Sequence, residues 1–102
     1  MKEVTEQNEL RELMNQPYCI LFFYTPFCRT CKIAERMLQV VIESKDLQEK
    51  VYVCNLNYFP SLAEDLKIQS VPALTIYREG SPGDILFAFE SVIKVDTFLS
   101  NE

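Results

Sequence analysis

Histidine is absent from this sequence of 102 residues, and with it the side chain that most often acts as a general base near neutral pH. Histidine is also a common zinc ligand, so any zinc site would need cysteine or carboxylate ligands alone. No cluster of Lys and Arg stands out along the chain, and 15 acidic residues against 10 basic ones give a formal net charge of −5. Since nucleic acids and anionic membrane surfaces favour positively charged partners, we expect the protein to bind neither.

Long apolar segments are lacking too. The longest apolar stretch, residues 18–24, is too short to cross a bilayer. Residues 1–6 are charged and contain no apolar core of a signal peptide, so we expect the protein to stay in the cytoplasm, where it is made. The chain is 48% hydrophobic and 25% charged, a balance typical of a soluble globular protein. Its length suits one compact domain over residues 1–102.

Hydrophobic periodicity predicts four helices and four strands in the order α, β, α, β, α, β, β, α. The expected helices cover residues 5–15, 28–44, 61–67 and 94–100, and the expected strands cover residues 18–24, 51–56, 73–77 and 85–89. We expect Thr5 to cap the first helix, a capping box from Ser61 to Glu64 to begin the third, and a turn over residues 78–83 to join the last two strands. The long helix has an apolar face formed by Ile33, Ala34, Met37, Leu38, Val41 and Ile42. This order predicts an α/β fold, a mixed sheet of about four strands with helices on both faces.

The most informative motif is Cys28-Arg29-Thr30-Cys31, which follows a buried strand and begins the long helix. The thiolate form of cysteine attacks disulfides, and the free N–H groups and partial positive charge of a first helical turn stabilise an anion there. We therefore expect Cys28 to have a lowered pKa, to which Arg29 adds a nearby cation. Cys31 lies one helical turn further on, close enough to attack a mixed disulfide formed on Cys28.

Two alternatives for this pair are a zinc half-site and an inert relic. Zinc needs four ligands, and the sequence contains no second CxxC and no histidine, so we expect no metal.

Cys19 and Cys54 each fall in a predicted buried strand. Parallel pairing of those strands would separate the two by about three residues, or ~10 Å, which is too far for a disulfide. We expect both to be buried core residues.

Two segments of the sequence resemble the thioredoxin family. Residues 22–32 (FFYTPFCRTCK) resemble that family's strand, loop and start of the active-site helix. Residues 68–77 (IQSVPALTIY) resemble the segment that holds the family's cis-proline, here Pro72. The resemblance covers roughly residue 10 to the C-terminus and implies the thioredoxin fold, a cis peptide bond before Pro72, and a backbone at Val71 that binds an extended substrate.

The resemblance implies that Cys28 is the nucleophile and Cys31 the resolving thiol. We expect substrate contacts from Phe27, Arg29, Thr30, Val71 and Pro72. Tyr24, Phe27 and Pro26 could together form an apolar rim around Cys28, although Tyr24 could equally belong to the core.

The sequence departs from the family pattern at several positions. The usual tryptophan before the first cysteine is Phe27, and the usual Gly-Pro between the cysteines is Arg29-Thr30. The family's buried acid, which helps to deprotonate the resolving thiol, falls on Phe22, so we expect resolution to limit turnover. The helix-kinking proline falls on Arg36, and only residues 2–4 could supply a first strand, which is short or absent.

The leading functional interpretation is a thiol–disulfide oxidoreductase that contributes to cell redox homeostasis. It would act on a disulfide-containing protein or small molecule, with electrons from a partner reductase or a low-molecular-weight thiol and with no bound cofactor. Two alternatives remain: a peptide-binding module of the same fold with little turnover, and a redox sensor whose Cys28–Cys31 bridge changes partner binding.

Overall fold

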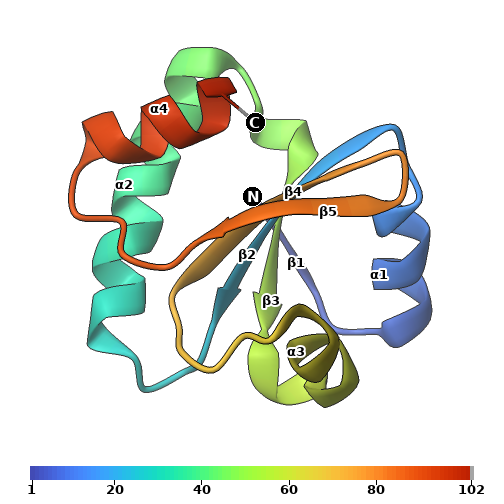
Figure 1. Cartoon of the computed structure of the whole chain (residues 1–102). Helices are drawn as coiled ribbons and strands as arrows, with labels where there is room; N and C mark the ends of the chain where they lie inside the picture. The colour runs from blue at the N-terminus through green and yellow to red at the C-terminus, as the bar shows by residue number, and fades with distance from the viewer. Residues whose placement is uncertain (102) are drawn as a thin grey trace.

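The computed structural model describes residues 1–101 as an α/β fold (Figure 1). The strands are β1 (Lys2–Val4), β2 (Tyr18–Tyr24), β3 (Val51–Asn55), β4 (Ala73–Arg78) and β5 (Ser81–Leu86), and the helices are α1 (Gln7–Met14), α2 (Arg29–Lys45), α3 (Pro60–Leu66) and α4 (Val92–Asn101). Two short 3-10 helices flank β3, at Gln48–Lys50 and Leu56–Tyr58. Among residues 1–101, no helix has both the length and the apolar character that a bilayer crossing requires.

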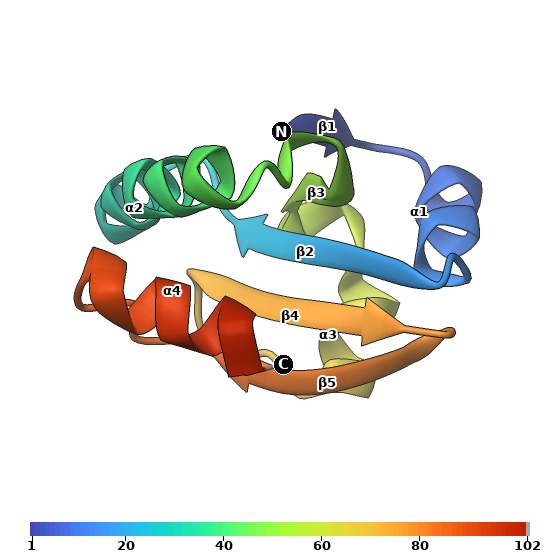
Figure 2. The ribbon, with the colours of Figure 1, turned by 90° about the horizontal axis from the view of Figure 1, so that it is seen from above.

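The strands form one mixed sheet in the order β1-β3-β2-β4-β5. β1 and β2 both run parallel to β3, whereas β4 is antiparallel to β2 and β5 is antiparallel to β4. Helices α2 and α4 lie on one face, and α1 and α3 lie on the other (Figure 2). The predicted mixed sheet with helices on both faces is confirmed, and the first strand is present but only three residues long.

Alternating side chains of the central strands enter two separate hydrophobic cores, because successive residues of a strand point to opposite faces of the sheet. Ile20 and Phe22 pack into the core under α2 and α4, whereas Leu21 and Phe23 pack into the core on the side of α1 and α3. Phe22 is fully buried and makes an edge-to-face contact with Phe89, with ring centroids 5.8 Å apart. Burial on both faces explains why residues 18–24 are continuously apolar.

The two predicted helix caps are wrong. Glu6, not Thr5, occupies the N-cap of α1 and makes no side-chain capping hydrogen bond. α3 begins at Pro60, and Phe59 stands at its N-cap, so the capping box from Ser61 to Glu64 does not form. Proline has no N–H to lose and has a backbone already suited to the first helical position, which is why the helix begins one residue earlier.

The last strand also differs from its prediction. The turn after β4 contains only Glu79 and Gly80, both with positive φ (53° and 81°), and Arg78 pairs directly with Ser81. Such a two-residue turn matches the right-handed twist of a hairpin, so β5 starts well before the predicted residue 85 and ends at Leu86. Phe89 therefore leaves the strand, which allows it to reach Phe22.

Candidate active site

Cys28 is the N-cap residue of α2. β2 ends at Tyr24, a short loop over residues 25–27 follows, and Cys28 has extended backbone angles (φ −102°, ψ 105°) immediately before the first helical residue. The backbone N–H of Cys31 donates a hydrogen bond to the Cys28 Sγ over 3.1 Å. The sulfur thus takes the place of the serine or aspartate oxygen that usually satisfies a free N–H at a helix start.

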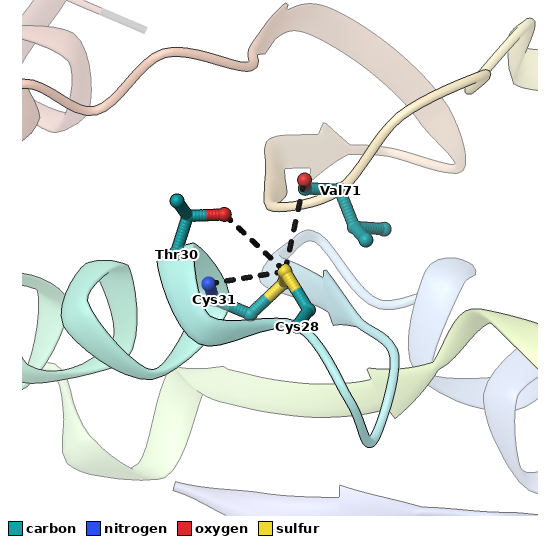
Figure 3. Close-up of a disulfide and its surroundings, with 4 residues drawn as sticks. All are labelled: Cys28, Thr30, Cys31 and Val71. Atoms are coloured by element: carbon teal, nitrogen blue, oxygen red, sulfur yellow. Dashed lines mark hydrogen bonds between the residues drawn. A yellow bond between two sulfur atoms is a disulfide. The ribbon is translucent and has the colours of Figure 1, made fainter.

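Three polar groups surround the Cys28 sulfur (Figure 3). Besides the Cys31 N–H, the Thr30 hydroxyl lies 3.3 Å from Sγ and the Val71 carbonyl oxygen lies 3.9 Å from it. Cys28 is disulfide-bonded to Cys31, so its sulfur has no proton and the Thr30 hydroxyl is the donor. Reduction would leave Cys28 between two hydrogen-bond donors, an arrangement that favours its thiolate.

The two bonded cysteines differ in access to solvent. Cys31 is only 2% exposed, whereas Cys28 is half-buried. Cys28 is therefore the more accessible of the two sulfurs.

Val71 and Pro72 come from a distant part of the chain, in the loop before β4. The Val71–Pro72 peptide bond is cis, the geometry that the family resemblance implies. Both residues are half-buried, and the Val71 carbonyl faces the Cys28 sulfur (Figure 3). The fold thus brings two of the predicted substrate-contact residues to the disulfide.

An apolar groove of about 360 Å³ begins beside the disulfide. Thr30 and Pro72 form the end nearest Cys28, α2 supplies one wall, and the segment after β5 supplies the other; the lining residues are Thr30, Ile33, Ala34, Met37, Pro72, Phe87, Ala88, Phe89 and Glu90. Ile33, predicted on the apolar face of this helix, is 49% exposed. Its helical period is that of a core residue, so only the position of the segment after β5 shows that Ile33 lines a groove.

Other predicted site residues lie outside this groove. Phe27 is fully exposed on the loop before Cys28, and Arg29 is exposed at the first position of α2. Tyr24 is half-buried, and its hydroxyl donates a hydrogen bond to the Glu3 carboxylate on β1. Burial and this bond raise the pKa of Tyr24. Tyr24 therefore belongs to the β1 side of the molecule and not to the groove at Pro72.

The position of the family's buried acid is wholly apolar. Phe22 packs against Ala34 and Leu38 of α2 within the core. Two carboxylates from other elements, Glu3 of β1 and Glu35 of α2, line a cavity of about 270 Å³ with Tyr24 and Val53. Glu35 follows Cys31 by four residues on α2, so both side chains lie on the same side of that helix.

Cys19 and Cys54 are free and fully buried, as predicted. The register places Cys54 opposite Phe23, four residues beyond Cys19 on β2, one residue more than expected. Burial raises the pKa of Cys19 to about 11 and that of Cys54 to about 12. Both thiols are therefore protonated at neutral pH.

Comparison with known proteins gives a consistent result. The thioredoxin family model matches residues 1–98. Thioredoxin-like protein YusE of Bacillus subtilis is 39% identical over 94 residues, which cover 90% of this chain and 84% of YusE. Thioredoxin of Porphyra purpurea is 26% identical over 85 residues, covering 82% of this chain and 79% of that protein.

The fold has matches among solved structures. Oxidised mitochondrial thioredoxin 3 of Saccharomyces cerevisiae superposes with a TM-score of 0.83 at 16% identity, covering 100% of this chain and 95% of that one. At this identity the match establishes the fold, and the sequence matches establish the relationship.

Proposed function

The chain belongs to the thioredoxin family, and we propose that it is a thiol–disulfide oxidoreductase in which Cys28 is the nucleophile and Cys31 the resolving thiol. The observation that carries this proposal is the position of the Cys28 sulfur. It caps α2, accepts hydrogen bonds from the Cys31 N–H and the Thr30 hydroxyl, and lies beside the Val71 carbonyl. The two donors stabilise a thiolate, and Thr30 next to it forms the near end of the apolar groove.

The reaction begins with the reduced protein. The Cys28 thiolate attacks one sulfur of the substrate disulfide, a new S–S bond forms, and the other substrate sulfur leaves as a thiolate that takes a proton from water. Cys31 then loses its proton and attacks the Cys28 sulfur, which breaks the intermolecular bond and releases the second substrate thiol. Two electrons pass from the dithiol to the substrate, and the Cys28–Cys31 disulfide results.

The groups around Cys28 suit an extended substrate. The backbone of Val71, next to Pro72, would hold the substrate chain beside the sulfur, and Thr30 forms the nearby end of the groove. Phe27 and Arg29 are exposed on either side of Cys28 and would contact the substrate surface. A reductase or a low-molecular-weight thiol would restore the dithiol, in a cytoplasmic role in redox homeostasis.

Insulin reduction with dithiothreitol as electron donor tests this activity. We expect the wild type to accelerate precipitation of the insulin B chain and Cys28→Ser to be inactive. Cys31→Ser should form a mixed disulfide with the substrate that persists on a non-reducing gel, because no second thiol resolves it. Cys54→Ala is the matched control and should keep its activity. A wild type no faster than Cys28→Ser would refute the proposal.

The alternatives predict different results. A binding module would give no acceleration with insulin but would capture peptides in both redox states. A sensor would bind a partner in one redox state only and would turn over slowly. The apolar groove is compatible with both, whereas the two donors aimed at the reactive sulfur favour catalysis.

A further inference from the structure

Three basic side chains form a stripe on the exposed surface of α2, next to the active site. Arg29, Lys32 and Arg36 are all exposed. At 3.6 residues per turn they fall within roughly 60° of one another around the helix axis. The stripe begins at the residue after Cys28 and runs along the first two turns of α2.

The beginning of this stripe lies where positive charge destabilises the helix. Positive charges near a helix N-terminus oppose the macrodipole, and the first turn of α2 contains no acidic residue to compensate. None of the ion pairs found within residues 1–101 involves Arg29, Lys32 or Arg36. Arg29 and Lys32 thus weaken their own helix, whereas Arg36 lies beyond the first turn. Because none of the three has an ionic partner among residues 1–101, an external partner explains them more readily than stability does.

The stripe borders the apolar groove. Ile33 lies between it and the groove on α2, and Phe87, 38% exposed, faces Ile33 across the groove. The one carboxylate among the lining residues, Glu90, is paired with Lys94 over 2.9 Å and adds little negative charge. The groove and the stripe thus form one continuous surface that starts at Cys28, apolar on one side and basic on the other.

This surface is exceptional in an acidic protein. The formal net charge is −5, and three of the glutamates, at residues 6, 9 and 12, belong to α1 or its N-cap, and α1 lies on the opposite face of the sheet (Figure 2). An acidic partner approaching the first two turns of α2 therefore meets three exposed cations and one half-buried carboxylate, that of Glu35, while the other face repels it.

We propose that the disulfide partner of this protein presents a segment with apolar side chains next to its reactive cysteine and carboxylates that lie over Arg29, Lys32 and Arg36. This inference rests on the proposed function, because it names the class of substrate for the same site. The apolar side chains enter the groove past Thr30 and Pro72, and the carboxylates fix the direction of the bound segment. Charge complementarity of this kind raises association rates and discriminates between partners.

Two disulfide-linked peptides test the proposal. They share the same apolar residues beside the cysteine and differ only in three flanking positions, Glu in one peptide and Gln in the other. Stopped-flow measurement of the reduced protein gives a second-order rate constant for each. We expect wild type to prefer the acidic peptide by about tenfold at low ionic strength and to lose that preference near 1 M salt.

Matched variants locate the effect. Lys32→Gln/Arg36→Gln should abolish most of the preference, whereas Arg11→Gln/Lys50→Gln, which removes the same charge from distant exposed sites, should keep it. Equal rates for the two peptides in wild type would overturn the proposal. It would also fail if Lys32→Gln/Arg36→Gln slowed both peptides equally and raised the pKa of Cys28, because the cations would then act on the thiolate. Failure of both peptides to react at all would refute the proposed function itself.

Discussion

The four cysteines form two groups in opposite environments. Cys28 and Cys31 occur at the start of a helix, and Cys28 is half-buried with two hydrogen-bond donors aimed at its sulfur. Cys19 and Cys54 lie inside strands of the sheet, fully buried, and burial raises the pKa of each thiol. The residue type is the same in all four cases, so backbone position and solvent access account for the difference in expected chemistry.

Alkylation should separate the two groups by the largest factor. In the reduced, folded protein at pH 7, we expect Cys19 and Cys54 to react with iodoacetamide more than ~100-fold slower than Cys28, because their thiolate fractions are far smaller. Cys31 should also react more slowly than Cys28. Mass spectrometry of the labelled peptides measures each rate, and labelling in denaturant is the control in which the differences should largely disappear. Labelling of Cys19 in the folded protein as fast as Cys28 would contradict the comparison.

The Phe22→Asp variant tests the effect of a carboxylate near Cys31, the buried cysteine of the reactive pair. We expect unfolding free energy to fall by about 3–5 kcal/mol, because a large apolar side chain is lost and a carboxylate is buried without a partner. Resolution of the mixed disulfide should become faster, because the new carboxylate can accept the Cys31 proton. Denaturant melts and stopped-flow reduction of a model disulfide measure the two effects.

Phe22→Leu is the control for Phe22→Asp. We expect it to lower the unfolding free energy without making resolution of the mixed disulfide faster. The missing acid would be irrelevant if the wild-type mixed disulfide never accumulated and Phe22→Asp changed nothing. Glu35, four residues after Cys31, would then be the next carboxylate to replace, and Glu35→Gln would be expected to slow resolution.

Alkaline pH should weaken the fold through the buried thiols. The pKa of Cys54 is raised in the folded state from 9.0 to about 12, so its contribution to stability is complete below pH 9 and is lost as pH rises from there to about 12. Between pH 8 and 10 we expect this thiol to remove about 1 kcal/mol of unfolding free energy. Urea melts of wild type and Cys54→Ala at both pH values measure it. If wild type lost no more unfolding free energy between pH 8 and 10 than Cys54→Ala, the pKa of Cys54 would not be raised in the folded protein.

Thr30→Val should give the smallest effect. Removing the hydroxyl that donates to the Cys28 sulfur should raise the thiol pKa by about 0.5–1 unit, since a single hydrogen bond contributes about 1 kcal/mol. Thr30→Ser keeps the hydroxyl and should restore the wild-type value. Absorbance at 240 nm as a function of pH, with Cys28→Ser as background, follows the thiolate. Identical titrations for Thr30→Val and wild type would show that the Cys31 N–H and the helix N-terminus stabilise the Cys28 thiolate without the Thr30 hydroxyl.

The parts of the site that follow from local sequence were predictable. Cys28 lies between a strand and a helix, and Pro72 lies just before a strand. In both cases the neighbouring elements are adjacent in sequence, so the position of each residue could be predicted from local pattern. The role of Ile33 as a groove residue was not predictable, because helical period alone cannot show that the segment after β5 leaves it on a groove wall. The basic stripe escaped notice because Arg29, Lys32 and Arg36 are scattered in sequence and meet only when α2 winds them together.

The fold shows the same division between local and distant effects. Period and apolar runs located every helix and the four longer strands, yet β5 was misplaced by several residues. Pro82 and Gly83 have the composition of a loop, but the two-residue turn at Glu79 and Gly80 draws Pro82 into pairing with Tyr77 of β4, and Gly83 follows within the same strand. Tertiary pairing overrides local propensity at such an edge.

That edge strand has a consequence for solubility. The outer strands of the sheet are β1, only three residues long, and β5, which carries Pro82 and Gly83 in exposed positions. A proline offers no N–H to an incoming strand, and a three-residue edge offers little to pair with. Neither side of the sheet is thus a good template for another chain, which protects a half-hydrophobic protein with an open apolar groove from edge-to-edge aggregation.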